Sequence, residues 1–341
     1  MAGIEAVAKL AGVSIATVSR ALSGKGHVSE RSKSKVQLAA NELGYIASSS
    51  AYTLATGRNR NIGVIMPYID RWFFGAFLES AESALVTAGY DLTVYNLNGG
   101  DEQRARIFNE FLMRRRVDAV LALAVAPSAQ ELEQLNRMKK PILAVGGYIK
   151  GARSLVMDDR AAGRLATEHL LSLGHTRIAN INGLESSDKE FNQPNLRHHC
   201  YLDALNSAGI EPKPELMVRA DFTLQSAYVV AKQILGNPYD APTAIFCNSD
   251  EMAFGAIMAA KDLGLQVPRD ISIIGIDNHD MSEFFQLTTV NQMVRDQGTE
   301  AVKILLNLLD DPSLEEHPNV EQKFDWVPEL LVRNSTARPM A

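Results

Sequence analysis

The sequence is poor in cysteine. Its 341 residues include only Cys200 and Cys247, and neither has a Cys or His neighbour at the spacing of a metal site. This argues against a disulfide framework or a zinc site and predicts two buried thiols. The sequence also lacks an apolar run long enough to span a membrane, and its N-terminus lacks the apolar segment of a secretory signal. We therefore expect a cytoplasmic protein.

Sequence motifs of the common enzyme classes are missing as well. There is no Gly-x-x-x-x-Gly-Lys-Ser/Thr phosphate loop, no Gly-x-Ser-x-Gly nucleophile turn, no His-Glu-x-x-His metal motif and no Gly-x-Gly-x-x-Gly nucleotide loop. An α/β hydrolase or a kinase would need one of them. The adjacent His198 and His199 are interpreted as surface residues of a helix start rather than as ligands. We expect no enzymatic activity, no metal and no cofactor.

The charge is distributed unevenly along the chain. The net charge is −6, yet residues 1–60 carry +5 and the remainder therefore carries −11. A small basic segment joined to a larger acidic body is typical of a DNA-contacting module attached to a domain with another task. The length favours two or three structural units.

The stretch Val7–Ser23 predicts two short helices joined by a tight turn. Gly12 lies where the chain must reverse, and glycine tolerates the positive φ that such turns need. Ser14 can cap the second helix, and Val18 and Leu22, four residues apart, give that helix one apolar side. This is the pattern of a helix-turn-helix, whose second helix enters a major groove. Paired amphipathic helices also occur in proteins that do not bind DNA, so the pattern alone leaves that alternative open.

The residue identities in the same stretch are more specific than its pattern. Val7-Ala-x-x-Ala-Gly-Val-Ser-x-Ala-Thr-Val-Ser-Arg-Ala-Leu22 resembles the headpiece of the lactose-repressor (LacI/GalR) family of bacterial transcription regulators. The resemblance implies a DNA-binding regulator that binds a pseudo-palindromic operator as a two-fold dimer. It covers essentially the whole chain, through blocks at Val28–Val36, Leu43–Tyr45, Leu173–Ile178, Ser249–Ala253, Val267–Asp277, Leu287–Val290 and Leu330–Thr336.

The predicted organisation is a headpiece over residues 1–46, a hinge or linker over 47–61, and an effector-binding and dimerisation core over 62–341. After Asn61, apolar runs of strand length alternate with helical patterns, one of them a helix over 103–116. About nine such strands predict two parallel sheets covered by helices, with ligands at the carboxyl ends of the strands. The resemblance implies the same fold class: an all-α helix-turn-helix headpiece and an α/β periplasmic-binding-protein-like core of two parallel-sheet subdomains.

The linker has few residues that a core could bury. In the family the matching stretch forms a short hinge helix on DNA, and Leu54 falls on the hinge leucine that wedges into the minor groove. Ala47, Ser48 and Tyr52 depart from the family's Pro, Asn and Arg at these positions. The resemblance therefore implies the leucine wedge but leaves the folding of the hinge open.

In the second helix of the headpiece, the resemblance places Ile15, Ala16 and Arg20 at base-reading positions. Arg20 can bond a guanine edge with two hydrogen bonds, whereas the other two side chains offer only apolar contact, for example to a thymine methyl. Three further residues are interpreted as phosphate contacts and caps, which position the helix without reading sequence. They are Ser14, Thr17 and Ser19.

The candidate effector residues of the core follow strands or begin helices. Asp277 ends an apolar strand and could accept two sugar hydroxyls, and Arg197 offers a guanidinium fork to hydroxyls or a carboxylate. By resemblance, Phe222 is an aromatic that stacks on the ligand, and Ser249 takes the place of an effector-binding Asn. Asp158 is a further candidate, and Asp250 is interpreted as the cap of the next helix.

Three aromatic residues, Trp72, Phe73 and Phe74, open the first helix of the core. The last two align with effector contacts of some family members, and three successive aromatics cannot all face one side of a helix, so at least one should pack in the core. Gly146 stands where many members place an Asp, which leaves the identity of the ligand open. Aromatic platforms beside Asp and Arg are typical of sugar sites.

We therefore predict a DNA-binding transcriptional regulator. It is expected to be a repressor whose operator affinity is set by a small molecule, and a sugar is the predicted effector. The alternative is a sugar-binding protein of transport or chemotaxis, which the core alone would suit. The basic headpiece and the missing signal segment speak against it. After Leu309 no heptad run follows, so a homodimer is expected.

Overall fold

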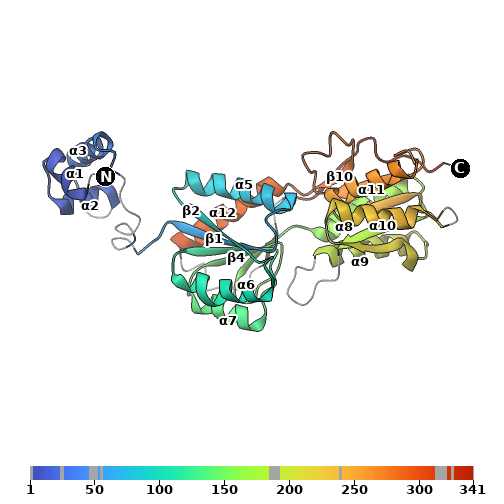
Figure 1. Ribbon diagram of the computed structural model, residues 1–341, viewed down its shortest axis with the longest axis horizontal. Coiled ribbons are helices and arrows are strands. Elements are labelled where there is room, and N and C mark those ends of the chain that lie inside the picture. The colour runs from blue at the N-terminus through green and yellow to red at the C-terminus, as the bar shows by residue number, and fades with distance from the viewer. Residues whose placement is uncertain are drawn as a thin grey trace. The chain divides into compact units, whose positions relative to one another are not determined.

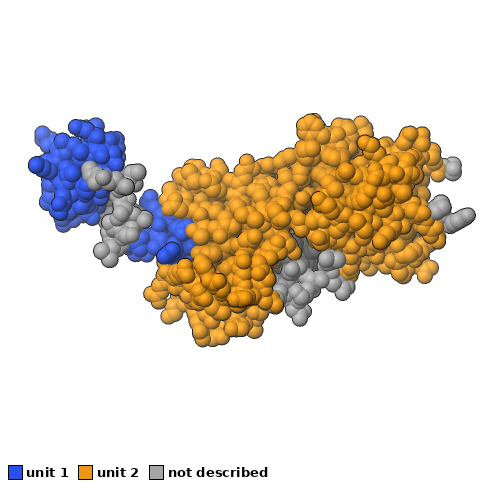
Figure 2. All heavy atoms as spheres, in the orientation of Figure 1, with its two compact units in different colours: residues 1–61, 116–118 blue, residues 62–115, 119–341 orange. Residues whose placement is uncertain are grey.

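The computed structural model describes residues 3–23, 27–45, 53, 57–183, 193–237, 240–311, 321–323 and 326–340. Its helices and strands are labelled in Figure 1. The chain divides into two compact units, which Figure 2 shows in different colours. One unit comprises Met1–Asn61 with Arg116–Asp118, and the other comprises Ile62–Arg115 with Ala119–Ala341.

The described residues of the first unit form the helices α1 (Ile4–Ala11), α2 (Ile15–Ser23) and α3 (Glu30–Glu42). Gly12 ends α1 with φ = 66°, which confirms the predicted turn, and the Ser14 hydroxyl accepts the Thr17 N–H at 3.1 Å at the start of α2. The helices meet around one fully buried valine from each: Val7, Val18 and Val36. Burying a valine side chain contributes about 2 kcal/mol, so these residues hold the small unit together.

The second unit begins with a six-stranded sheet in the order β11-β5-β4-β3-β1-β2. Its central strands run parallel, with Val64 paired to Leu121 and Leu121 to Leu143. Helices α5 and α12 lie on one side and α6 and α7 on the other (Figure 1). The bounds are β1 (Asn61–Met66), α5 (Trp72–Thr87), β2 (Asp91–Asn96), α6 (Gly100–Arg106), β3 (Ala119–Leu123), α7 (Ala129–Arg137), β4 (Ile142–Val145), β5 (Arg153–Val156), α12 (Val294–Asp310) and β11 (Glu321–Lys323).

A second six-stranded sheet has the order β12-β10-β9-β8-β6-β7. From β10 to β7 each strand runs parallel to its neighbour, whereas β12 pairs antiparallel with β10. The chain enters this sheet after β5 and returns to the first through α12 and β11, so each subdomain is built from separate segments. The bounds are α8 (Asp159–Ser172), β6 (Ile178–Gly183), α9 (Gln193–Ser207), β7 (Met217–Ala220), α10 (Leu224–Leu235), β8 (Ala244–Cys247), α11 (Asp250–Asp262), β9 (Ser272–Ile276), β10 (Thr288–Asn291) and β12 (Glu329–Leu331), with a 3₁₀ turn at Pro214–Leu216.

The predicted fold class is confirmed, with local differences. In place of a continuous helix over 103–116, α6 is followed by a π-helical turn, η1 (Ile107–Phe111), and a 3₁₀ turn, η2 (Leu112–Arg114). Phe108 and Leu112 of this segment are both about 1% exposed. Both cysteines are buried free thiols, as predicted. No helix among the described residues is long and apolar enough to cross a membrane.

Candidate functional site

The exposed side of α2 presents the predicted base-reading residues. Ile15, Ala16 and Arg20 are exposed while Val18, on the opposite side of the helix, is fully buried. The Ser14 hydroxyl is engaged with Thr17, through its N–H and a 2.9 Å contact with its Oγ1, so Ser14 acts as a helix cap in this structure. Ser19 is half-buried. Leu54 and the departures at Ala47, Ser48 and Tyr52 lie outside the described residues.

In the second subdomain, polar side chains gather where the strands of the sheet end. We call Asp159, Arg197, Asn248, Asp277 and Gln292 the strand-end cluster. Arg197, on α9, is 6% exposed, and its Nε and Nη2 both lie 2.8 Å from Oδ1 of Asp159. Its Nη1 donates to the Asn248 carbonyl at 2.8 Å and its Nη2 to Gln292 at 3.4 Å. The guanidinium is therefore held by protein acceptors.

Asp277 joins this cluster through Gln292. The Gln292 side-chain amide donates to one oxygen of the Asp277 carboxylate, and the Asp250 N–H donates to the other at 3.4 Å. The structure thus brings together two residues that the sequence singles out, Arg197 and Asp277. Sequence reasoning missed the residues that join or hold them, Asp159, Asn248 and Gln292. Their signal is position alone: each follows a strand or begins a helix at the carboxyl edge of a parallel sheet.

Asp250 has a different role from the predicted helix cap. The hydroxyl of Ser249 caps α11 by accepting the Met252 N–H at 3.3 Å. Asp250 is fully buried and accepts hydrogen bonds from Ser282 Oγ at 2.6 Å, from Thr289 Oγ1 at 2.7 Å and from the His279 N–H at 2.9 Å. These donors come from the segments after β9 and from β10, so the Asp250 carboxylate ties them to the start of α11 and leaves the capping to Ser249.

Burial governs the electrostatics of this edge. It raises the pKa of Asp250 to about 6, and burial together with the neighbouring Asp250 raises the pKa of Asp277 well above its usual range. Burial also raises the pKa of Asp159, although Arg197 acts in the opposite direction. The cluster therefore concentrates acidic groups, and one guanidinium balances only one of them.

Replacing Asp277 with Asn is expected to stabilise the folded protein more at pH 8 than at pH 4.5. A carboxyl group whose pKa is raised by folding contributes stability below its unfolded pKa and loses that stability as the pH rises through the folded pKa. The amide of Asp277→Asn would carry no charge to desolvate or to repel Asp250. Urea unfolding at both pH values gives the free energy of unfolding of the variant and of the parent. The value for the variant minus that for the parent should increase with pH. The exposed Asp203→Asn serves as control, and a difference that stays constant with pH would contradict the assignment.

Two polar side chains beside the cluster correct or extend the sequence-based predictions. His198 is half-buried and not a surface residue, because its Nδ1 lies 2.8 Å from Asn180 Oδ1. Asn180 donates in turn to Asn248 Oδ1 at 3.1 Å, and Asn248 donates to Asn182. The Nδ2 atom of Asn182 is buried and has no hydrogen-bond acceptor among the residues that the structure describes. It is a donor that a ligand could use.

The aromatic residues at the start of α5 divide into two groups. Trp72 stacks on His279 with ring centroids 4.7 Å apart, and its indole Nε1 donates to Asp280 at 3.0 Å. It therefore spans from the first subdomain to the loop that follows β9 of the second. Phe73 and Phe74 contact each other edge to face and pack against the hydrophobic core, as expected for part of this triplet.

Three predicted effector residues make local contacts instead of joining the cluster. Asp158 caps α8, where it accepts the Ala161 N–H at 3.0 Å, and Ser249 caps α11. Phe222 has φ = 62° and packs against the core of the second subdomain. Their part in ligand binding stays a prediction.

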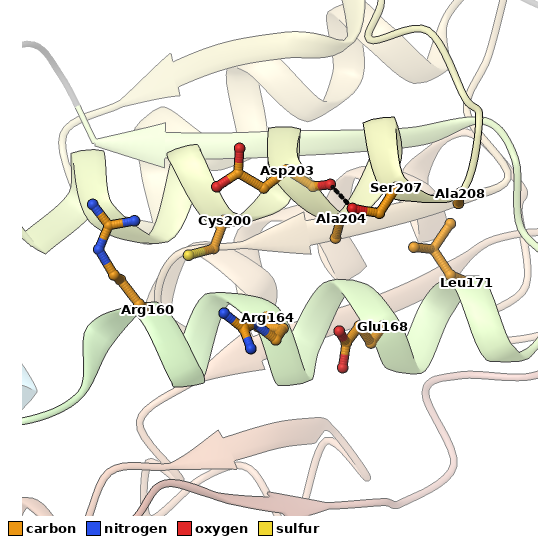
Figure 3. A pocket seen from close by; sticks show the side chains of 9 residues that line it. All are labelled: Arg160, Arg164, Glu168, Leu171, Cys200, Asp203, Ala204, Ser207 and Ala208. Carbon is orange, nitrogen blue, oxygen red and sulfur yellow. Dashed lines mark hydrogen bonds between the residues drawn. The ribbon is translucent and has the colours of Figure 1, made fainter.

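A cavity of about 440 Å³ lies between α8 and α9 (Figure 3). Arg160 and Arg164 line it from α8, and Cys200, whose pKa burial raises, lines it from α9. None of the predicted effector residues lines this cavity, so it does not coincide with the strand-end cluster. Within the described parts of the chain, no group of three or more His, Cys, Asp and Glu side chains could hold a metal ion.

Both the sequence and the structure of the chain are similar to those of known proteins. Residues 3–48 match the model of "bacterial regulatory proteins, lacI family", and residues 167–336 match a periplasmic binding protein-like domain. The chain is 33% identical to the HTH-type transcriptional repressor PurR of Vibrio vulnificus over 99% of both chains. It is similar to the lac repressor dimer bound to operator (27% identity, 98% and 99% coverage, TM-score 0.82) and to a complex of the transcriptional regulator CelR with cellobiose (26%, 98% and 100%, TM-score 0.72).

Proposed function

The chain belongs to the LacI family of bacterial regulatory proteins, and we propose that it is a homodimer that binds a pseudo-palindromic operator under the control of a sugar. It is a DNA-binding transcriptional repressor with a small-molecule effector, and not an enzyme. The headpiece match over residues 3–48 disfavours the alternative of a transport or chemotaxis protein.

For the DNA side, we assign base reading to the exposed side of α2. Arg20 donates two hydrogen bonds to a guanine edge, and Ile15 and Ala16 contact thymine methyl groups. The supporting observation is that all three are exposed on a helix whose other side is buried. Leu54 is assigned the minor-groove wedge by resemblance to the family, and Thr17 and Ser19 the phosphate contacts.

For the dimer, we propose that a second copy covers apolar side chains on α10, α11 and the segment after β9. Val229, Met258 and Phe284 are exposed there, the last by 80%, and large exposed apolar side chains mark interaction surfaces when they cluster. The similar lac repressor structure is a dimer on operator, and a two-fold dimer would place one headpiece on each half-site of a pseudo-palindrome.

If the protein is a homodimer, light scattering should give two chains per particle. Phe284→Glu should shift the particle towards one chain, because a charge would be buried in the interface without a partner. Glu283→Gln, a change of the exposed neighbouring residue, is the matched control. Four chains per particle, or a variant as dimeric as its parent, would overturn the proposed interface.

For the effector, we propose that a neutral sugar binds at the strand-end cluster. The observation that carries this proposal is the chain of hydrogen bonds from Arg197 through Gln292 to Asp277 at the carboxyl edge of the sheet. Asp159 already neutralises Arg197, so the cluster offers acidic acceptors to hydroxyl groups and little attraction to an anion. Asn182 supplies a donor. The similar CelR structure is a complex with cellobiose.

A thermal-shift screen of neutral sugars, cellobiose and D-ribose among them, tests this assignment. A ligand present at about 100 times its Kd stabilises the folded state by about 2.7 kcal/mol. Asp277→Ala should abolish the shift for the sugar that gives it, whereas Glu168→Gln in the α8–α9 cavity should leave it unchanged. A shift that survives Asp277→Ala, or one given by sugar phosphates but by no neutral sugar, would refute the assignment.

A further inference from the structure

Asp118, the residue before β3, holds the end of the linker. Its side chain is 1% exposed, and its two carboxylate oxygens face the backbone of residues 59 and 60. Oδ1 accepts the Asn59 N–H at 2.9 Å and the Asn59 Nδ2 at 3.2 Å, and Oδ2 accepts the Arg60 N–H at 2.7 Å. Hydrogen bonds to an ionised acceptor are the stronger kind, so this carboxylate fixes two consecutive linker residues.

The attachment continues without a break into the sheet. The Asp118 N–H donates to the Asn61 carbonyl at 2.8 Å, and the Asn61 side chain donates to the Arg116 carbonyl at 3.0 Å. One residue further along both strands, Ile62 pairs with Ala119 in the parallel register of β1 and β3. The Asp118 side chain therefore holds the linker at residues 59 and 60, and the backbone ladder begins at Asn61, the first residue of β1.

The backbone at this point is held in an unfavourable conformation. Arg60 has φ = 53°, in the left-handed region, where the side chain of an L residue crowds the following carbonyl. Non-glycine residues keep such a conformation only where the surroundings determine it. The Asp118 carboxylate binds the N–H groups of both Asn59 and Arg60 and thereby keeps Arg60 in this conformation.

We propose that Asp118 is a positioning residue that fixes the point at which the linker leaves the core, and that operator binding by the paired headpieces depends on its carboxylate. This inference rests on the proposed function. Each released residue adds up to about 3.5 Å of reach. The effective concentration of a tethered module falls as its tether lengthens beyond the span it must cover. Loss of the anchor would therefore weaken binding that needs both headpieces at once.

The same anchor lies at the start of a strand that leads to the effector side. β1 begins at Asn61, beside Asp118, and the chain that leaves its far end reaches Trp72 at the start of α5. Trp72 contacts His279 and Asp280 of the second subdomain. A displacement of Trp72 would therefore be transmitted to the linker through one buried strand, because Asp118 holds residues 59 and 60 in place. A flexible turn at residues 59 and 60 would absorb such a displacement, whereas the buried Asp118 carboxylate prevents this.

The test compares Asp118→Asn with Glu133→Gln, a change of an exposed residue on α7. Asn keeps one acceptor oxygen but turns an NH₂ group towards a backbone N–H. Amide hydrogen exchange should show that Asn59 and Arg60 are protected in the parent and exposed in Asp118→Asn. Binding is measured on a duplex selected from random DNA by the parent protein, and on a scrambled duplex. Asp118→Asn should bind the selected duplex more weakly than the parent does, without an equal loss on the scrambled duplex, so that the ratio of the two affinities falls.

A second variant keeps the inference testable if Asp118→Asn fails to fold. Two glycines inserted after Gly57 lengthen the linker and should give the same selective loss. If both variants fold, combining them should weaken binding to the selected duplex further, because both changes lengthen the same tether. The inference is overturned if either variant keeps the parent's affinity for the selected duplex, or if the two amides are unprotected in the parent. A parent that selects no duplex at all would instead refute the proposed function.

Discussion

Arg197→Ala is expected to lower the free energy of unfolding by about 3–5 kcal/mol and to abolish the response to the sugar. Removing one partner of a buried ion pair leaves the other charge without compensation, which is the costly case. Here the abandoned group is Asp159, which is 4% exposed and has two guanidinium nitrogens of Arg197 at 2.8 Å. Asn248 and Gln292 would lose a donor at the same time.

The structural cost can be separated from the loss of binding with a double variant. Replacing Arg197 with Met and Asp159 with Leu removes both charges, and apolar pairs of similar volume often match or exceed the stability of a buried ion pair. The double variant should recover most of the stability in urea unfolding and still give no thermal shift with the sugar. A single variant that costs less than about 1 kcal/mol, or a double variant that responds to the sugar, would contradict the role of Arg197.

Arg20→Ala is expected to weaken binding to the selected duplex by about 1–3 kcal/mol per half-site, roughly 5- to 150-fold. The variant should also lose its preference at one base pair in each half-site. The physical reason is the loss of two hydrogen bonds to a guanine edge, which Ile15 and Ala16 cannot replace. Competition binding with single-base variants of the duplex measures both effects.

A residue that only contacts phosphate would behave differently. Its removal would weaken selected and scrambled duplexes alike, and it would reduce the slope of log K against log salt by about one for every phosphate that is no longer neutralised. Lys33→Ala, on the exposed side of α3, is the control for a general loss of positive charge. Equal losses on both duplexes for Arg20→Ala would show that this residue does not read bases.

The headpiece is predictable from the sequence because its determinants are local. Gly12 and Ser14 fix the turn between α1 and α2, and Val18 marks the buried side of α2 within a single turn of the residues on its exposed side. Each of these is decided by neighbours at most four residues away. The base-reading assignment follows from which side remains exposed.

The alternation of strands and helices in the core is predictable for the same reason, but several details are not. The periodicity of residues 103–116 predicts a regular helix and gives no sign of the π-helical turn after α6, where Phe108 is buried. The antiparallel pairing of β12 with β10 joins Leu331 to Thr289, far away in the sequence. No periodicity within either segment indicates that pairing, because it is decided by which edge of the sheet remains open.

The strand-end cluster is predictable only in part. Asp277 and Arg197 can be singled out because they follow family motifs, yet their partners lie 38 and 95 residues away from Arg197, at Asp159 and Gln292. Asp250 illustrates the same limit. Its position beside Ser249 suggests a helix cap, and only the three donors brought in by Ser282, Thr289 and His279 reveal a buried acceptor.

We expect a ligand in the core to control sequence-specific binding by the headpieces. The most direct measurement is the affinity for the selected and the scrambled duplex at one salt concentration, with and without the sugar found in the thermal-shift screen. We predict a specificity ratio of about 10³ or more without the sugar, and a change of about 5- to 150-fold in the affinity for the selected duplex on its addition. The affinity for the scrambled duplex should stay the same. Equal affinities for the two duplexes, or an equal effect of the sugar on both, would contradict the account.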